Sequence, residues 1–166
     1  MHLRTPTALA ALLIAAALPA GQAAAHHAFQ AEFDHDAPVT LTGQISSVDW
    51  DNPHSRILVT VAEAGKAPQS WAVLTGTPGR MRDRGLCPET LKPGTAVVIH
   101  AFQSREKDCA SSRTGPNGSI WPVPKGTCKA GGDTLTFEAT RTVVDLYNGK
   151  PTTDGAPEPA ICRSAP

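Results

Sequence analysis

Histidine is the residue type in this sequence with the clearest capacity for chemistry, and most of its copies lie near the start of the chain. Four of the six histidines are found between residues 26 and 54: His26, His27, His35 and His54. Neutral imidazole is the side chain that most often binds metal ions, and square-planar nitrogen donors favour Cu(II) or Ni(II). The cluster predicts a copper or zinc site built from His26, His27 and His54, with copper as the candidate cofactor.

The position of the histidine pair depends on the segment that precedes it. Residues 1–25 have a basic start, an apolar run over 8–18 and three closing alanines, which is the pattern of a secretory signal peptide. Cleavage after Ala25 would make His26 the terminal residue, so that its α-amine and its ring could chelate one metal ion. Cleavage one or two residues earlier would place a histidine third, where amine, backbone amides and imidazole form a square-planar chelate. The alternative is that both histidines are solvated residues of a frayed terminus.

A second candidate site surrounds a predicted turn at residues 50–54. A tryptophan is followed there by Asp, Asn, Pro and His, and these residues favour a turn over a strand. An aromatic ring beside such a turn can stack on an apolar or sugar-like ligand. Core packing of the tryptophan and structural hydrogen bonding by the histidine are the alternatives. The predicted ligand-binding residues are Trp50, Asn52 and His54 on one wall and Trp121, from a later loop, on the other.

The sequence shows no arrangement of catalytic residues. Asp34, Asp36, Asp49 and Asp51 invite comparison with the paired carboxylates of glycosidases, but no pair has a fixed spacing on a rigid element. There is no Gly-rich phosphate loop, no Gly-x-Ser-x-Gly nucleophile elbow and no nucleotide fingerprint. We therefore expect a protein that is not an enzyme. The enzymatic alternative is a copper oxidase-type terminus that acts on polysaccharide, which requires His26 as the first residue.

The four cysteines favour disulfide bonds, because an even number of cysteines in an exported chain is typical of oxidised pairs. Cys109 and Cys128 lie in one Gly/Ser/Pro-rich segment that a bond between them would close. Cys87 with Cys162 would then tie the tail to the domain. Redox chemistry is the alternative, although the sequence has no Cys-x-x-Cys motif.

The remaining sequence predicts the elements that must position these residues. Alternating apolar and polar residues indicate five strands, and Thr-Pro and Gly punctuation indicates a short helix between the third and the fourth. In chain order the elements are 39–50, 56–62, 70–75, the helix at 77–85, 95–102 and 134–146. This order is that of the OB-like Greek-key barrel, a small, mainly β fold with five strands. An immunoglobulin-like sandwich is the alternative, although it needs about seven strands and no internal helix.

Length and charge limit the organisation of the chain. About 140 residues remain without the leader, which is the size of one domain. We expect the domain to span 26–148, with 104–133 as an inserted loop, and 149–166 to form a loosely held tail. Loss of the leader lowers Lys+Arg from 15 to 14 against 15 Asp+Glu, so the domain lacks the basic excess that binds nucleic acid. No segment reaches the roughly 20 apolar residues that span a membrane.

Three stretches of the sequence together resemble a known family. They are His26 to Asp34 (HHAFQAEFD), Pro38 to Gly43 (PVTLTG) and Val48 to His54 (VDWDNPH), and the likeness continues through Trp71, Pro78-Gly79, Arg84-Gly85 and Leu91 to Gly94. Over residues 26–103 the chain resembles the domain-of-unknown-function family 6152, a family of exported bacterial proteins. The resemblance implies an exported small β domain without an assigned reaction. The positions that match a candidate site are His26, His27, Glu32, Asp34, Trp50, Asn52 and His54.

The absence of a nucleophile–base arrangement and the ligand-capable order of strands favour a periplasmic or secreted protein that binds a small ligand or acts as an accessory module. Its partner would be a small ligand or a periplasmic protein. The alternative is a copper- or zinc-binding periplasmic protein that uses the N-terminal histidines.

Overall fold

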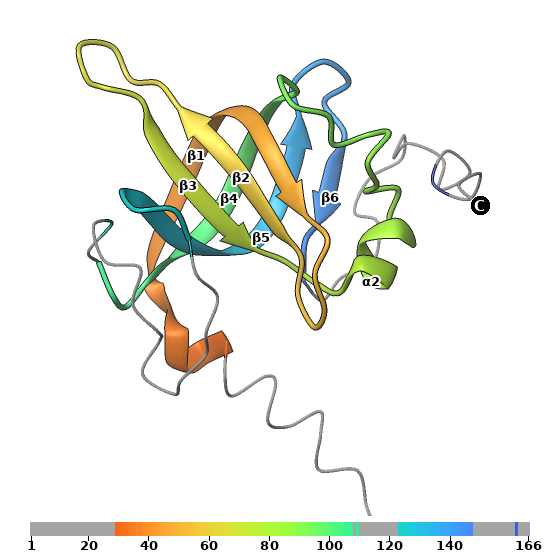
Figure 1. Ribbon diagram of the computed structural model, residues 1–166, viewed down its shortest axis with the longest axis horizontal. Coiled ribbons are helices and arrows are strands. Elements are labelled where there is room, and N and C mark those ends of the chain that lie inside the picture. The colour runs from red at the N-terminus through yellow and green to blue at the C-terminus, as the bar shows by residue number, and fades with distance from the viewer. Residues whose placement is uncertain (1–28, 108, 110–122, 148–161, 163–166) are drawn as a thin grey trace, which may run out of the picture.

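The computed structural model describes residues 29–107, 109, 123–147 and 162, and this part of the chain is mainly β, as expected (Figure 1). A helical turn over residues 29–32 precedes the first strand. No helix in these ranges has the length and hydrophobicity required to cross a membrane. In chain order the elements are β1 (Phe33–Asp49), β2 (Arg56–Val61), β3 (Gln69–Leu74), α2 (Pro78–Arg82), β4 (Ala96–Ser104), β5 (Thr127–Phe137) and β6 (Val143–Asp145).

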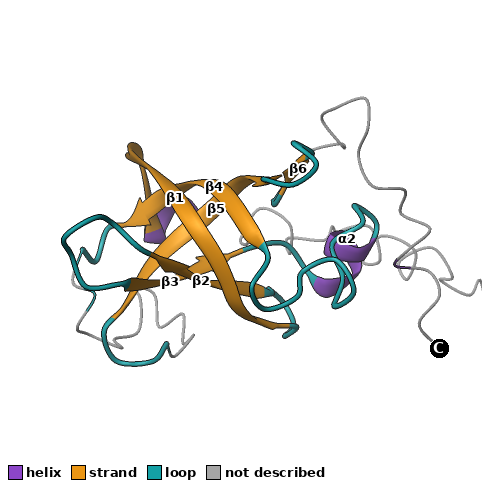
Figure 2. Ribbon diagram, turned by 90° about the horizontal axis from the view of Figure 1, so that it is seen from above, coloured by secondary structure: helices purple, strands orange, loops and turns teal. Residues whose placement is uncertain are grey.

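The strands form one sheet whose hydrogen bonding closes into a ring. β1 is antiparallel to β4 over its first part and to β2 over its second part. β2 pairs with β3, and β4 pairs with β5, again antiparallel. β3 and β5 complete the ring as a parallel pair, from Ser70 opposite Thr127 to Leu74 opposite Gly131. The ring therefore runs β1–β2–β3–β5–β4 and returns to β1, while β6 pairs with the later part of β5 (Figure 2).

The main core lies inside this ring. In β2 the side chains of Ile57, Val59 and Val61 are buried, and the residues between them are partly exposed. This is the alternation of a strand with one covered face. The same rule buries Val97 and Ile99 of β4. These residues belong to one apolar cluster to which the other strands also contribute.

The predicted helix is present as α2, which lies at one end of the ring, away from the helical turn at 29–32 (Figures 1 and 2). Thr77 caps it, since its hydroxyl oxygen accepts a hydrogen bond from the Arg80 backbone N–H over 3.2 Å. Pro78 occupies the first turn, where its missing N–H costs nothing. Met81 is fully buried and joins α2 to the main core.

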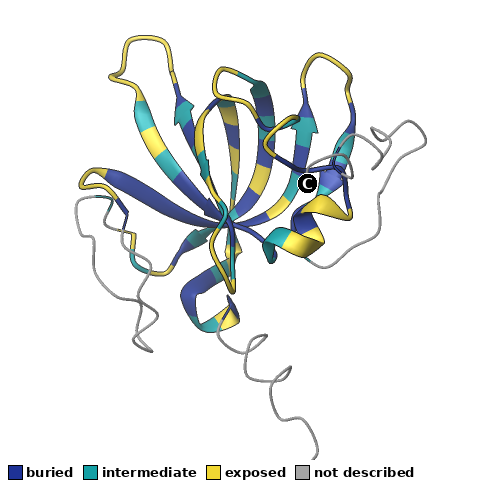
Figure 3. Ribbon diagram, turned by 45° about the vertical axis from the view of Figure 1, so that its right-hand side comes forward, coloured by how far each residue is buried: buried dark blue, intermediate teal, exposed yellow. Residues whose placement is uncertain are grey.

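A second apolar cluster covers the outer side of β3 and β5. Residues 72–74 of β3 and 127–132 of β5 are all buried, so both faces of these strands are covered there (Figure 3). The cover is formed by Phe29 from the helical turn, Phe33 at the start of β1 and Val123 before β5. The N-terminal end of the described chain is thereby fixed on the sheet.

Two adjacent glycines of β5 allow apolar side chains to pack on both of its faces. A Cβ atom at Gly131 would lie 2.7 Å from Phe33 Cδ2 and would also collide with the ring of Phe29. A Cβ atom at Gly132 would lie 2.7 Å from Leu146 Cδ1 and 3.1 Å from the Leu74 carbonyl oxygen. Successive residues of a strand point to opposite faces of the sheet. The missing side chain at each glycine therefore leaves room for apolar residues to pack on one of the two faces.

The structure moves several predicted boundaries. β1 begins at Phe33 and not at residue 39, because its pairing with β4 shifts register between Phe33 and Pro38 and so accommodates the proline. The predicted inserted loop 104–133 was too long, since 127–133 lie in β5. The predicted strand 134–146 is divided, because the chain reverses after Phe137 and returns as β6. The predicted leader and the tail, apart from Cys162, lie outside the described residues.

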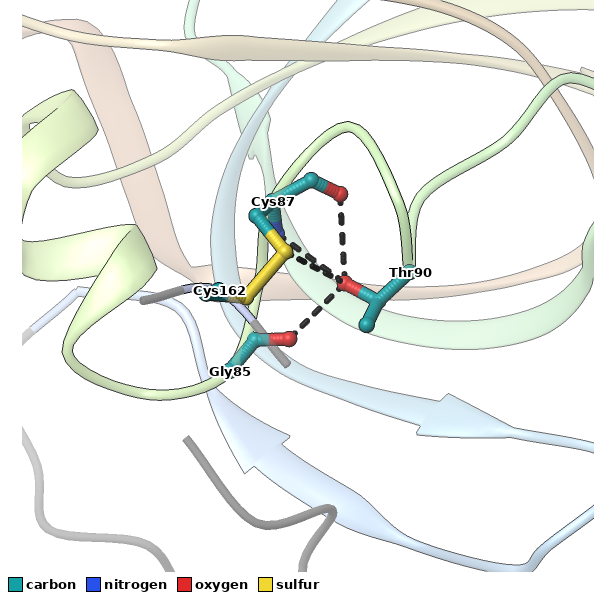
Figure 4. The surroundings of a disulfide bond; sticks show 4 residues. All are labelled: Gly85, Cys87, Thr90 and Cys162. Atoms are coloured by element: carbon teal, nitrogen blue, oxygen red, sulfur yellow. Dashed lines mark hydrogen bonds between the residues drawn. A yellow bond between two sulfur atoms is a disulfide. The ribbon is translucent and has the colours of Figure 1, made fainter. Parts of the chain in front are cut away.

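Two disulfide bonds join Cys87 to Cys162 and Cys109 to Cys128, the pairs that the sequence favours. The first fastens Cys162 to the segment that follows α2, and the second joins Cys109 to β5. Thr90 supports Cys87, because its hydroxyl accepts a hydrogen bond from the Cys87 backbone N–H over 3.0 Å and donates to the Gly85 carbonyl over 2.8 Å (Figure 4). All four cysteines are therefore oxidised.

The contacts around Gly132 predict that even a small substitution there destabilises the folded state. The variant Gly132→Ala should lower the free energy of unfolding by about 1–3 kcal/mol, the usual cost of overpacking a core, because the added methyl group meets Leu146 and a backbone oxygen. Urea unfolding followed by tryptophan fluorescence measures the change. Gly79→Ala is the matched control, since a Cβ atom there meets only Thr77 Oγ1 at 4.0 Å. Equal stability of the two variants would contradict the packing argument.

Candidate functional site

The structure describes one of the three residues predicted to bind metal. His26 and His27 lie outside the described residues, as does Trp121 of the predicted ligand site. Within the described ranges, no group of three or more His, Cys, Asp and Glu side chains is arranged to hold a metal ion. The predicted metal site therefore stays a prediction from the sequence.

His54 is held by the fold. Its Nδ1 donates a hydrogen bond to the Thr75 carbonyl oxygen over 3.1 Å. Its ring stacks on Tyr147, with 6.2 Å between the ring centroids and 15° between the ring planes. Trp50 is half-buried against the main core, whereas Asn52 is exposed. The predicted turn therefore contributes to packing through two of its residues.

Aspartates near the same turn are engaged in ion pairs. Arg56 of β2 pairs with Asp49 over 3.3 Å and with Asp51, so both carboxylates face one guanidinium group. Asp34 pairs with Arg105 over 3.5 Å. Each of these three aspartates is therefore engaged in an ion pair with an arginine.

A pocket with a volume of about 130 Å³ opens beside the second apolar cluster. We call it the aromatic pocket. Its walls come from the helical turn, the start of β1, the end of β4, the middle of β5 and the residue that follows Leu146. The lining residues are Phe29, Gln30, His35, Phe102, Gly132, Asp133 and Tyr147.

Ring contacts fix the walls of the aromatic pocket. The centroid of the Phe29 ring lies 4.3 Å from that of Tyr147 and 5.9 Å from that of His35. His35 in turn lies 4.4 Å from Phe102. Tilted aromatic pairs at such separations stabilise one another beyond the apolar area that they bury. The rings form a continuous series, and through Tyr147 this series reaches His54.

Hydrogen bonds to β5, to β6 and to the segments on either side of α2 position Tyr147. Its backbone N–H donates to Asp145 Oδ1 over 2.8 Å, and Arg84 donates to the Asp145 carbonyl oxygen over 3.0 Å. The preceding residue, Leu146, accepts from the Gly76 N–H over 2.9 Å and donates to the Asp133 carbonyl over 2.8 Å. The segment after β6 is thereby fastened to the chain on either side of α2 and to β5.

Residues 13–113 match the family of unknown function DUF6152. The chain belongs to this family. No curated protein and no solved structure matches the chain significantly. The DUF6152 match contains Phe29, His35 and Phe102, whereas Asp133 and Tyr147 lie beyond it. The aromatic pocket is thus closed by residues outside the matched region.

Sequence reasoning missed most of the lining of the aromatic pocket. Phe29, Phe102 and Tyr147 are single aromatic residues at distant positions, and nothing in their local spacing relates them. The signal that was present is the pair Gly131-Gly132, since glycine inside a strand marks a place where other groups approach the backbone closely. Polar and small residues surround that pair, so the local sequence predicts a loop there.

Burial raises the pKa of Tyr147 above the ordinary tyrosine value, and the positive charge of Arg80 partly opposes this shift. Burial likewise lowers the pKa of Arg84, while the Asp145 carboxylate acts in the opposite direction. The phenol at the wall of the aromatic pocket is therefore harder to ionise in the folded protein than in the unfolded chain. As a result, the free energy of unfolding falls as the pH rises from the ordinary tyrosine pKa through the raised pKa of Tyr147.

The titration of Tyr147 gives a direct test, because it is the chain's one tyrosine. Phenolate absorbance should show a midpoint above the ordinary tyrosine value of about 10. The variant Arg80→Ala should raise this midpoint further, since a cation that stabilises the phenolate is lost. Arg82→Ala, on the same helix, is the control and should leave the midpoint unchanged. A midpoint that falls in Arg80→Ala would contradict the assigned charge effect.

Proposed function

We propose that this chain is an exported, non-enzymatic protein that binds a small ligand in the aromatic pocket. The observation that carries the proposal is an open hollow of about 130 Å³ with aromatic walls, an exposed carboxylate and a half-buried histidine neighbour in His54. Pockets of this kind, mostly apolar with a few polar groups, are the usual form of small-molecule sites. The family match gives no activity that would compete with this assignment.

The strand arrangement supports an OB-like Greek-key barrel as the scaffold of the site. The ring β1–β2–β3–β5–β4 and the helix between β3 and β4 follow the element order of that fold. OB folds bind ligands on the β2–β3 face, between the β1–β2 and β4–β5 loops. Here Phe29, Phe33 and Val123 cover part of that face. The ligand would therefore bind beside this cover, where the aromatic pocket opens.

One residue predicted from the sequence, His54, contacts a wall of this proposed site. His54 contacts Tyr147 of the aromatic pocket by stacking, so it supports the wall from behind. Trp50 and Asn52 belong to the same β1–β2 loop, whereas Trp121 lies outside the described residues. In an OB-like scaffold the β1–β2 loop would flank a larger ligand that extends beyond the pocket.

A binding role without catalysis agrees with the charges of the described residues. Asp34, Asp49 and Asp51 are each paired with an arginine. Asp133 lines the pocket, and no second carboxylate accompanies it in the part of the lining that the structure describes. Glycosidase-type chemistry needs two.

Ligand binding is tested by protein-observed NMR with a library of small fragments. Hits should shift the backbone amides of Gln30, His35 and Asp133 together. The variant Phe102→Ala should weaken these hits by about fivefold, because one aromatic wall is lost. Val98→Ala, on the same strand outside the pocket, is the matched control. A library that perturbs no pocket amide, or hits that are unaffected by Phe102→Ala, would refute binding at this site.

Export rests on the leader pattern of residues 1–25 and on the two disulfide bonds, which persist in oxidising compartments. Intact mass and N-terminal sequencing of the protein recovered from the host's periplasm or medium test it. We expect a first residue between Ala24 and His26 and a mass lowered by two hydrogens for each disulfide. An uncut chain with free thiols would refute the export proposal.

The same measurement addresses the second candidate function, copper or zinc binding by His26, His27 and His54. The favourable observation is the pair of histidines directly after the leader pattern, where a free amine can join a ring nitrogen. This chelate needs a histidine in the first or the third position. Any other processed terminus removes the proposed metal site and leaves the aromatic pocket unaffected.

A further inference from the structure

We infer that the aromatic pocket takes an organic cation, a ligand that carries a methylated ammonium group. The inference rests on the proposed ligand-binding function and names the chemistry of its ligand. It stands on three features of the described residues: the ring walls, a carboxylate without a partner, and the absence of cations from the lining.

The rings of Phe29, Phe102 and Tyr147 supply the first feature. Aromatic faces carry negative electrostatic potential, and a cation within about 6 Å of a ring centroid is attracted to it. The three rings line one hollow, and Phe29 contacts Tyr147 at a centroid distance of 4.3 Å. A methylated ammonium group is weakly hydrated and apolar at its surface, so it can contact rings that would exclude a hydrated metal ion. Cages of aromatic residues are the usual sites for such groups.

Asp133 supplies the second feature. Its backbone carbonyl accepts a hydrogen bond from Leu146, which fixes the residue at the pocket. Its side chain is exposed and, among the described residues, makes neither a hydrogen bond nor an ion pair. A carboxylate beside aromatic walls would repel an anionic ligand and attract a cationic one.

The charged groups near the pocket agree with a cationic ligand. Among the described residues, the lining contains no lysine and no arginine. Arg105 donates to the Gln30 carbonyl over 3.3 Å, but its charge is compensated by Asp34. Arg80 acts on the phenol of Tyr147 from outside the lining. Asp133 is thus the one uncompensated charge among the described residues that line the pocket.

The size of the hollow fits the same group. A volume of about 130 Å³ corresponds to roughly four water-sized groups. A trimethylammonium head consists of one nitrogen and three methyl groups. The remainder of such a ligand would extend through the open side of the pocket.

Choline and its neutral carbon isostere, 3,3-dimethylbutan-1-ol, form the probe pair for the test. The protein is used as exported, without its leader, and each titration is followed by calorimetry and by NMR of the pocket amides. The titrations are made at about pH 8, where histidine side chains are generally neutral. Choline should bind about tenfold more tightly than the isostere, because the two differ only in charge. Asp133→Asn should weaken choline binding about fivefold and leave the isostere unchanged. Asp36→Asn, an exposed aspartate outside the lining, is the control and should change neither.

The outcomes separate this inference from the proposed function. Equal affinities for choline and the isostere would refute the preference for a cation, whereas the pocket would remain a site for a small ligand. Binding of fragments without binding of choline would lead to the same conclusion. An unchanged choline affinity in Asp133→Asn would overturn the role of the carboxylate, and an unchanged choline affinity in Phe102→Leu would overturn the role of the rings. If neither the two probes nor any fragment shifts a pocket amide, both proposals fail.

Discussion

Close packing against the backbone at Gly131 and Gly132 is the constraint on which the rest of this structure depends. β5 is the strand that pairs with β3, β4 and β6, and apolar side chains of other segments pack on both of its faces. Phe29 and Phe33 occupy the space where a side chain at Gly131 would lie, and Leu146 occupies the space at Gly132. Because interiors are packed at crystal-like density, a methyl group at either position displaces one layer. The main core and the second apolar cluster meet at these two residues.

The aromatic pocket follows from this arrangement. Phe29 can lie on the sheet only because Gly131 leaves room, and Tyr147 reaches Phe29 only because Leu146 holds the chain against Gly132. Arg84 and Asp145 then fix the direction of the segment after β6. The site is therefore built from the helical turn at 29–32 and from the residue after Leu146, brought together by the strand between them.

The charged residues around the site are of two kinds, those held in ion pairs and one that can contact a ligand. Arg56 binds two aspartates at the β1–β2 turn, and Arg105 binds Asp34. Asp133 lines the aromatic pocket and is exposed. This difference underlies the class of ligand that we propose, because an unpaired carboxylate beside aromatic rings favours a cation over an anion or a neutral sugar.

The sequence by itself determined the features that depend on near neighbours in the chain. Alternation of apolar residues predicted β2 and β3 to within two residues, Thr77-Pro78 predicted the helix, and the family match was recognisable from motifs around Trp50 and His54. Element order also predicted a mainly β fold. The boundaries of β1 and β5 were missed, since the register shift at Pro38 and the burial of Gly131-Gly132 depend on strands that are distant in sequence. Only the tertiary structure decided which aromatic residues meet, because Phe29, Phe102 and Tyr147 become neighbours through strand pairing and packing, which no local pattern encodes.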